Sequence, residues 1–304
     1  MKKTLLFLPL ALFANLALLP AQDDLLSLLG EEKTTDYTTA TFKTTRIVNG
    51  HSVENCGAGV LDFKISHRFA PVRNGVYDMF GLDDATIRIG LDYGITNRLM
   101  VGIGRGGNEK MIDGFLKYKL LRQSSGRKNM PVTVAFLTDM EVRTLKFLDP
   151  ERDNKFSDRL FFANQLLIGR KFNESISLQL MPTLVHRNLV PTTGDKNDVF
   201  SIGAAGRIKL SRRVTFNAEY YYVPEGQISQ DYANALSVGF EIETGGHVFQ
   251  LHFTNAQDMH YAGFVTETAE NWFFKNGEGK TMSGIRFGFN ISRVFTLKKP
   301  KGLE

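Results

Sequence analysis

The stretch that decides the fold is ATIRIGLDYGITNRLMVGIGR, residues 85–105. From Ala85 to Tyr93 every second residue is apolar, and the residues between them are polar or glycine. This period of two is typical of a β-strand, in which successive side chains point to opposite faces. The turn at residues 94–97 reverses the chain, and the same alternation resumes at Leu99. The stretch therefore predicts a β-hairpin with one continuous apolar face.

The opposite face of this hairpin indicates its environment. It carries Arg88 and Asp92 among several glycines. Strands of a transmembrane barrel are roughly 9 to 11 residues long, with apolar side chains turned to lipid and polar side chains turned to the lumen. The hairpin fits this description in length and in pattern. We therefore predict that its apolar face contacts lipid and that its charged face lines a lumen.

The rest of the chain repeats the hairpin. From Val60 to Phe295 the alternation predicts twelve strands, joined by tight turns and longer connections, the longest at residues 255–281. Short periplasmic turns and long outer loops are typical of outer-membrane barrels, and an even strand number returns both ends to the periplasm. The predicted fold class is all-β, a transmembrane antiparallel up-and-down β-barrel of about 12 strands at 57–296, followed by a periplasmic tail at 297–304.

The amino-terminal end has the pattern of a secretory signal peptide. Lys2 and Lys3 precede an apolar run that ends near a small residue, Ala21. A charged start, an apolar middle and a small residue at the cleavage point are typical of a removed leader. No later segment approaches the ~18 consecutive apolar residues of a spanning helix. Residues 1–21 are therefore predicted to be a signal peptide for a protein of the outer membrane.

Residues 22–56 are predicted to form a short periplasmic arm before the barrel. Residues 22–32 combine early acids with a leucine-rich flank, which fits either a short amphipathic helix or an unstructured leader. Residues 41–48 alternate weakly, but a thirteenth strand would break the even count. We therefore place them outside the closed sheet, either paired locally with the first strand or tucked toward the lumen.

Composition agrees with a barrel and excludes other classes. Hydrophobic residues make up 42% of the chain and charged residues 23%, and a barrel with an apolar outside and a polar lumen has such an average. The 24 Phe and 9 Tyr, against a single Trp, favour strands and lipid interfaces. A net charge of +5 gives no argument for nucleic acid. Because Cys56 is the only cysteine, no internal disulfide can form.

Several separated motifs, in the same order along the chain, resemble the β-barrel proteins of domain-of-unknown-function family 5777. The resemblance implies an outer-membrane barrel of Gram-negative bacteria, and it supplies no substrate and no catalytic residues. The motifs are Thr45-Arg46-Ile47, Asn49-Gly50-His51-Ser52-Val53-Glu54, His67-Arg68-Phe69, Phe80-Gly81-Leu82-Asp83, residues 87–94, Gly102-Ile103-Gly104-Arg105, Asp113-Gly114-Phe115-Leu116-Lys117-Tyr118 and Ile285-Arg286-Phe287-Gly288-Phe289-Asn290-Ile291-Ser292-Arg293.

The charged residues predicted to point inward are the main candidate site. Charges of both signs inside a barrel are tolerated when they are paired or hydrated, so they fit either a salt-bridge plug or a polar pore for small solutes. The balance of charge offers no ion selectivity, which favours the plug. The predicted lumen residues are Asp62, Lys64, Arg68, Arg88, Asp92, Asp113, Lys117, Lys119, Arg207, Lys209, Glu219, Glu241 and Arg286.

Motifs for catalysis, cofactors and metals are weak. Gly102, Gly104 and Gly107 match a dinucleotide fingerprint in letters, but no helix follows them, as that site requires. His247 and His252 are five residues apart in one strand, so they point to opposite faces and cannot share a metal. The outward histidines have no serine partner for an esterase triad. We predict no catalytic residue, no cofactor and no metal site.

The longest connection holds the only tryptophan. Trp272, Phe273 and Phe274 form an aromatic cluster that is too apolar to remain in solvent. We expect the cluster either to fold over the mouth of the barrel, as a lid or docking loop, or to lie at the lipid interface, where aromatic rings anchor proteins.

The sequence thus favours a passive outer-membrane barrel. The leading hypothesis is a channel, or a structural barrel whose loops dock a partner, and the alternative is a lipid-modifying enzyme or a transporter of hydrophobic small molecules. The expected partners are outer-membrane lipids, the barrel assembly machinery, and either small polar solutes or a surface or periplasmic protein. Nucleic acid is not expected.

Overall fold

The computed structural model describes residues 34–147 and 149–298 of the chain. The predicted signal peptide at 1–21 and the predicted helix at 22–32 lie outside the described residues, as does most of the predicted tail. Within the described ranges, no helix is long and apolar enough to cross a membrane.

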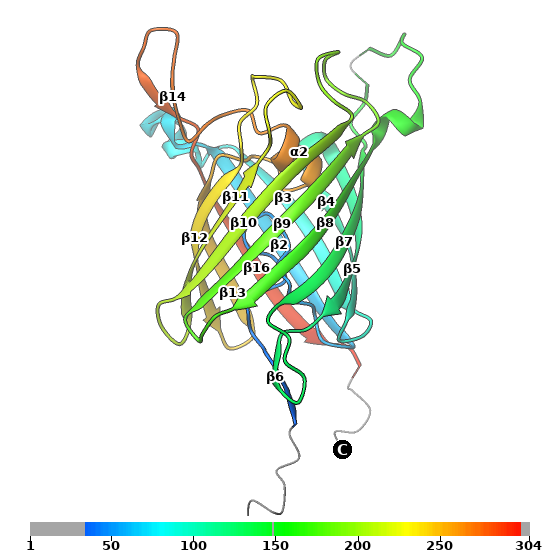
Figure 1. Cartoon of the computed structure of the whole chain (residues 1–304). Coiled ribbons are helices and arrows are strands. Elements are labelled where there is room, and N and C mark those ends of the chain that lie inside the picture. Colours follow the sequence, from blue (N-terminus) through cyan, green and yellow to red (C-terminus); the bar gives the residue numbers. More distant parts are fainter. Residues whose placement is uncertain (1–33, 148, 299–304) are drawn as a thin grey trace, which may run out of the picture.

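Twelve antiparallel strands close into one barrel, as predicted (Figure 1). Closure joins the last strand to the first, where Ile291 pairs with Ile65 and Phe295 pairs with Leu61. Every barrel strand therefore has two neighbours, and the barrel sheet has no free edge. The strands are β2 (Val60–Pro71), β3 (Ala85–Gly94), β4 (Leu99–Gly106), β5 (Met111–Leu121), β7 (Thr133–Arg143), β8 (Leu160–Lys171), β9 (Ile176–Arg187), β10 (Asp198–Lys209), β11 (Val214–Tyr222), β12 (Leu236–Thr244), β13 (His247–Thr254) and β16 (Arg286–Thr296).

The alternation of apolar and polar residues corresponds to the outside and inside of the barrel. On β3, the outward residues Ile87, Ile89 and Leu91 are 41–46% exposed, whereas Arg88 and Asp92 between them are buried inside. The same apolar exposure recurs on the other strands. A closed barrel with an exposed apolar band and satisfied backbone groups suits a lipid environment.

The two ends of the barrel differ. Connections of two to four residues join β3 to β4, β8 to β9, β10 to β11 and β12 to β13 at one end, which we call the turn end. Both ends of the described chain lie at the turn end (Figure 1). There β1 (Thr35–Tyr37) pairs with β6 (Ser124–Gly126) below the barrel.

The opposite end, which we call the loop end, carries the longer connections. They contain the short elements η1 (Val72–Asn74), η2 (Val76–Gly81), η3 (Asn108–Lys110), η4 (Phe156–Arg159), α2 (Tyr261–Thr266), β14 (Phe273–Lys275) and β15 (Thr281–Ser283).

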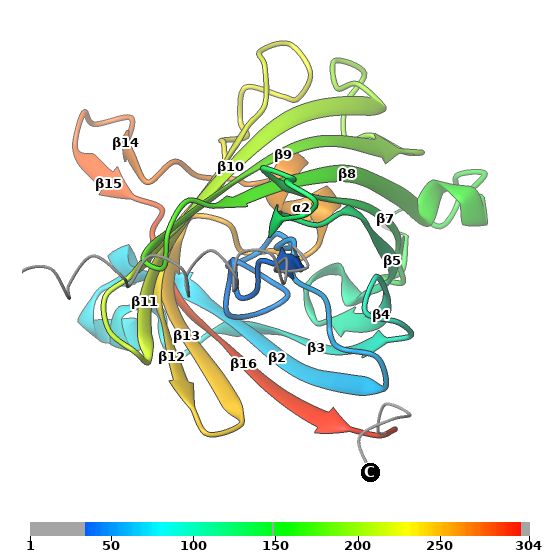
Figure 2. The same cartoon turned by 60° about the horizontal axis from the view of Figure 1, so that its bottom comes forward.

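Residues 41–56, which we call the arm, run inside the barrel. Figure 2 shows this blue segment within the ring of strands. The chain rises from the turn end, reverses at Asn49 and Gly50, and returns to start β2; the reversal is marked by a bridge between Arg46 and His51. Of the two positions expected for 41–48, the lumen is therefore correct, and pairing with the first strand is wrong.

The lumen is packed like a protein interior. The arm buries Phe42, Ile47 and Val53 in one apolar cluster with the inner face of the wall from β7 to β10. Burial of each such side chain contributes about 1.5–3 kcal/mol. The wall residues in this cluster are Ala135, Leu137, Ala163, Leu167, Met181, Val185, Val199 and Ala205.

Candidate functional site: an occluded lumen

One carboxylate of the barrel wall holds the tip of the arm. Glu219 on β11 is 2% exposed and accepts a hydrogen bond of 2.7 Å from the backbone N–H of Asn49. It also accepts bonds of 3.2 Å from the N–H groups of Val48 and Gly50. Three successive N–H groups thus converge on one anion, as in the backbone nests that bind anions. Because the tip pairs with no strand, Glu219 supplies the acceptor that these donors require.

Side-chain amides hold the rest of the turn. Gln250 on β13 donates to the carbonyl of Ile47 at 2.8 Å, and Asn290 on β16 donates to the carbonyl of Val48 at 2.9 Å. Gln179 on β9 donates to the carbonyl of His51 and accepts from the N–H of Val53, both at 2.8 Å. These side chains replace the backbone partners of a sheet, so the arm is built into the lumen by specific contacts.

The tip also approaches the wall very closely. A Cβ atom at Gly50 would lie 1.9 Å from the hydroxyl oxygen of Tyr221 on β11. No larger residue fits there without displacing the Tyr221 ring, which is 1% exposed. The glycine of the Asn49-Gly50 turn is therefore required by close packing.

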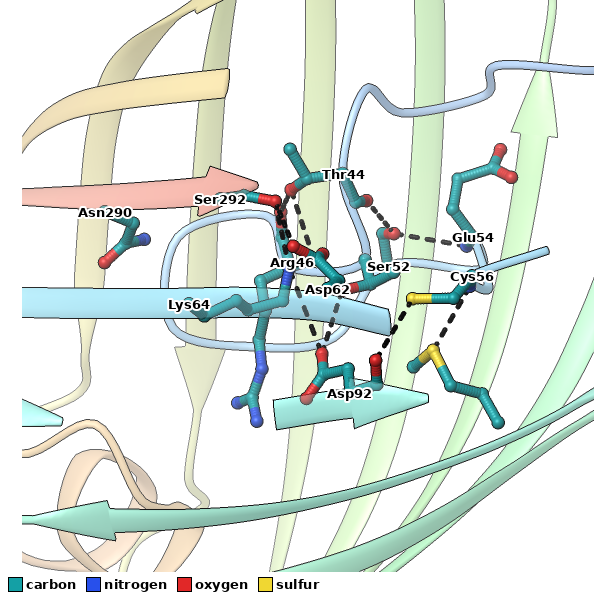
Figure 3. Close-up of polar contacts among 12 residues, drawn as sticks. Thr44, Arg46, Ser52, Glu54, Cys56, Asp62, Lys64, Asp92, Asn290 and Ser292 are labelled. Atoms are coloured by element: carbon teal, nitrogen blue, oxygen red, sulfur yellow. Dashed lines mark hydrogen bonds and ion pairs between the residues drawn. The ribbon is translucent and has the colours of Figure 1, made fainter. Parts of the chain in front are cut away.

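Three charged residues on β2 and β3, Asp62, Lys64 and Asp92, are paired with one another and contact the arm (Figure 3). Lys64 forms an ion pair with Asp62, whose other oxygen accepts from the hydroxyl of Ser292 at 2.6 Å. Asp92 lies 3.9 Å from the Lys64 ammonium and accepts from the arm hydroxyl of Thr45 at 3.2 Å. Paired charges of this kind fit a filled lumen, since an isolated buried charge would be costly.

Of the other residues predicted for the lumen, some contact the arm or the inner wall, and one is exposed. Lys117 donates to two arm carbonyls, and Lys119 lies 3.8 Å from Glu54 of the arm. Lys209, at the last position of β10, is exposed, so the prediction that it lies in the packed lumen is wrong. Those buried inside the barrel are Asp62, Lys64, Arg68, Arg88, Asp92, Asp113, Lys117, Arg207, Glu219, Glu241 and Arg286.

A short helix covers the lumen at the loop end. All six residues of α2 are buried, and Figures 1 and 2 place the helix within the outline of the barrel. Its first N–H groups, which lack partners within a helix, donate to the carboxylate of Glu141 on β7; that of Ala262 does so at 3.0 Å. We call residues 256–268 the cover. Sequence reasoning missed it because six residues are too few to show a helical period.

An ionised histidine connects the cover to the wall. The Nδ1 atom of His260 lies 2.6 Å from Asp258, and its Nε2 atom lies 3.2 Å from Asp113 on β5. Burial alone would lower the pKa of His260, but the carboxylates of Asp258 and Asp113 outweigh it and raise the pKa to about 10. The imidazole is therefore charged at neutral pH, and Asp113 also pairs with Arg88.

The cover and the arm touch each other. The hydroxyl of Tyr261, in the cover, accepts a 3.4 Å hydrogen bond from the backbone N–H of His51, in the arm. The two rings are stacked, with centroids 6.4 Å apart. The same hydroxyl donates to Gln165 on β8 at 2.8 Å. A movement of either segment therefore changes contacts of the other.

The predicted aromatic cluster lies beside the mouth, not over it. The indole of Trp272 donates to the carbonyl of Leu236 at the loop end of β12, at 2.8 Å. Phe274 lies under the guanidinium of Arg73, and Phe273 is 66% exposed on the projecting β14–β15 hairpin. The part of this connection that lies over the lumen is residues 256–268 instead.

A cavity lies between the arm and the wall, and the acidic and histidine side chains that the structure describes are not clustered as metal ligands. Among the described residues, no group of His, Cys, Asp and Glu side chains is arranged to hold a metal ion. A cavity of about 360 Å³ lies between the arm and the wall at the turn end, and Phe42, Lys43, Cys56 and His247 are among its lining residues.

These observations define a membrane-type β-barrel that is occluded by its own chain. The chain belongs to the family described as membrane bound beta barrel domain (DUF5777), whose model matches residues 42–295. The resemblance found in the sequence is thereby confirmed, and the matched range includes the arm as well as the strands. No curated protein matches the chain in sequence.

Solved barrels are similar only in general shape. The NanC porin is 8% identical, with 77% of this chain and 98% of that chain covered and a TM-score of 0.46. The KdgM porin is 8% identical, with 78% and 99% covered and a TM-score of 0.45. The outer membrane protein Omp33 of Acinetobacter baumannii is 7% identical, with 77% and 97% covered and a TM-score of 0.40. At these scores the likeness carries no functional argument.

Proposed function

We propose that the protein is an outer-membrane channel of the passive class that is closed at rest, with the arm as its plug and residues 256–268 as its cover. The observation that supports this is the way the arm is held. Side chains such as Glu219 and Gln250 bind its tip, and no strand ladder joins it to the wall. The arm can therefore leave through the turn end while every strand of the barrel stays paired.

The sidedness of the barrel supports its orientation. The turn end carries the short connections and both described chain ends, so we assign it to the periplasm and the loop end to the cell exterior. A leader at 1–21 would be removed after export. The arm then faces the periplasm, where a partner could pull it, and the cover faces external solutes.

An enzymatic role has less support. The outward histidines by strand alternation are His67 and His247. His67 stacks on Phe289 with ring centroids 4.9 Å apart and also lies against Phe69, and His247 stacks on Phe249. Both rings are therefore part of the aromatic outer surface of the barrel.

The second candidate is a structural or docking barrel that never opens, and the close packing of the arm against the apolar wall favours it.

Single-channel recording in planar bilayers separates the two candidates. Glu219→Ala removes the acceptor of three arm N–H groups, so we expect frequent conductance steps where the wild type shows rare ones. Glu225→Ala, in an exposed loop, is the matched control and should behave as wild type. Correct folding of each variant is checked by heat-modifiable gel migration. A folded Glu219→Ala barrel without conductance would support the structural role.

A crosslink can show that the arm is the moving part. A Cβ atom at Gly169 on β8 would lie 3.5 Å from the Cβ atom of Val53 in the arm, a separation that suits a disulfide, so Val53→Cys and Gly169→Cys form a crosslinking pair. Cys56→Ser is included so that no third thiol competes. In the Glu219→Ala background, oxidation of this pair should silence the conductance and reduction should restore it. The variant without Gly169→Cys cannot form the crosslink and is the control. Conductance that ignores the redox state of a crosslinked sample would contradict arm withdrawal.

A further inference from the structure

A loop at the loop end exposes an unusual amount of apolar surface. Its sequence is VYDMFGL, residues 76–82, which follows β2 and contains η2. Five of its seven residues have large, apolar and exposed side chains, and neither the plug nor the cover uses them. The exposed fractions are 73% for Val76, 94% for Tyr77, 56% for Met79, 53% for Phe80 and 46% for Leu82.

The backbone holds this loop in a fixed shape. Met79 and Phe80 have positive φ angles of 47° and 57°, a region that such residues rarely adopt. The N–H of Phe80 donates to the carbonyl of Gly75 at 2.7 Å. Gly81 has φ 90°, and a Cβ atom there would lie 2.3 Å from the carbonyl oxygen of Ala70 in β2. Close contact with the strand end thus maintains a strained turn that keeps the apolar side chains outside.

Arg73 fixes the loop to the longest connection. Its guanidinium forms an ion pair with both carboxylate oxygens of Glu270 and donates to the carbonyl of Ser283 at 3.0 Å. The ring of Phe274 lies 5.6 Å from the guanidinium carbon. The loop and the β14–β15 hairpin therefore form one body.

This body lies to the side of the barrel mouth. Figure 1 shows the cyan loop at the height of the strand ends, below the β14 hairpin, and Figure 2 shows it extending beyond the wall formed by β12, β13 and β16. The outward surface of the adjacent strands is aromatic. Phe287 on β16 lies 5.7 Å, between ring centroids, from Phe69 on β2 and from Phe253 on β13. The lipid-facing surface thus continues from the strands toward the loop.

We propose that residues 76–82 are a membrane-interface foot, whose occupant is the acyl-chain and headgroup boundary of the lipid leaflet at the loop end. The lateral position and the continuity with the lipid-facing aromatic surface select lipid as the partner. The loop's own ionisable side chain is an acid, Asp78, and Asp83 and Asp84 follow. The foot therefore binds by burial of apolar side chains and not by attraction to anionic headgroups. The proposal holds whether or not the lumen opens.

The single tryptophan of the chain makes a direct test available. In a Trp272→Phe background, Tyr77→Trp places the only indole on the foot. The protein is folded into phosphatidylcholine vesicles that carry bromine on the acyl chains, and its fluorescence is compared with that in unbrominated vesicles and in iodide solutions. We expect quenching by the brominated lipid, weak quenching by iodide and no change of either in high salt.

Two matched variants calibrate the scale. Ile89→Trp, on the outward face of β3, gives the response of an indole in lipid. Glu278→Trp, at an exposed position in the turn of the β14–β15 hairpin, gives the response of an indole in water. If the indole at residue 77 responds as that at 278, the foot faces water and the proposal is wrong, and the apolar loop is then a docking site for a protein. Quenching by lipid that disappears in high salt would overturn the apolar mode of binding.

Discussion

The arm and the cover, which together close the lumen, are both held by a wall carboxylate that accepts backbone N–H groups. At the tip of the arm, Glu219 receives three successive backbone N–H groups, and at the start of α2, Glu141 receives two. The further contacts differ. The arm's turn is held mainly by neutral amides such as Gln250, whereas the cover is also held by the charged imidazole of His260.

Because of this difference, the two closures respond differently to pH. Amide contacts do not titrate, so the hydrogen bonds of Gln250 and Asn290 to the arm are independent of pH. Only a protonated imidazole can donate to both Asp258 and Asp113, so deprotonation of His260 removes one of these donors and the ion pairs. Since Tyr261 of the cover touches His51 of the arm, loosening the cover also removes a contact of the plug. The cover therefore depends on pH through His260, a contact that the amides of the arm do not supply.

The largest expected effect is the pH dependence of the cover. The pKa of His260 is about 10 in the fold, above its ordinary value of 6.5. A group with a raised pKa contributes stability that is fully present below its unfolded pKa, near pH 6.5, and is lost as the pH rises through about 10. The full contribution is on the order of 5 kcal/mol. The carboxylates of Asp258 and Asp113 set this shift against the opposing effect of burial.

Denaturant unfolding of the wild type and His260→Gln in detergent, measured from pH 6 to pH 10.5, checks this prediction. The free-energy difference between the two proteins should be greatest near pH 6 and shrink toward pH 10. Subtraction removes the titration of groups that both proteins share. A difference that stays constant over this range would show that the imidazole is not charged.

The next largest effect concerns the arm. Glu219→Ala leaves the N–H groups of Val48, Asn49 and Gly50 without their acceptor, and each lost bond costs about 1 kcal/mol. We expect a loss of about 3 kcal/mol in the free energy of unfolding, together with faster protease cleavage of the arm. Glu219→Gln keeps one acceptor oxygen and should recover part of the loss. Equal losses in both variants would point to the charge and not to the hydrogen bonds.

Removal of the matching carboxylate in the cover should have a smaller effect. Glu141→Ala leaves the N–H groups of Tyr261 and Ala262 without a partner, which costs about 2 kcal/mol. We expect hydrogen exchange to accelerate in residues 256–268 first and to leave residues 48–50 nearly unchanged. Equal acceleration in both segments would mean that the closures open as one unit, through the Tyr261 contact.

The sequence predicted the outside of this molecule better than its inside, for a physical reason. Lipid is a uniform partner, so every outward residue, such as Ile89 or Leu91, obeys the same rule. The inner face of the barrel has two kinds of surroundings. Near β3 it is charged, whereas Leu137, Leu167 and Met181 face the arm and are apolar. Alternation cannot distinguish such inward apolar residues from outward ones.

The sequence leaves the position of the arm between two alternatives and gives no signal for the cover, for related reasons. The arm at 41–56 alternates only weakly because side chains of the barrel satisfy its backbone groups, and its partners Glu219 and Gln179 are far away in the sequence. The cover is one short helix within a long connection, where the more conspicuous Trp272 and Phe273 suggested a lid. A turn such as Asn49-Gly50 signals a reversal, but only the fold shows that it must fit against Tyr221.

The smallest expected effect tests where the packed lumen ends at the turn end of the barrel. Lys117 is buried and donates to the arm carbonyls of Ser52 and Glu54, whereas Lys209, expected inside by the same alternation, is exposed at the end of β10. An exposed surface substitution changes stability by about 0.5 kcal/mol or less, so Lys209→Ala should unfold at the same denaturant concentration as the wild type. Lys117→Met, measured beside it, leaves two arm carbonyls without a donor and should lower that concentration. If the two variants shifted equally, Lys209 would contact the arm after all, and the rim of the lumen would lie beyond the last residue of β10.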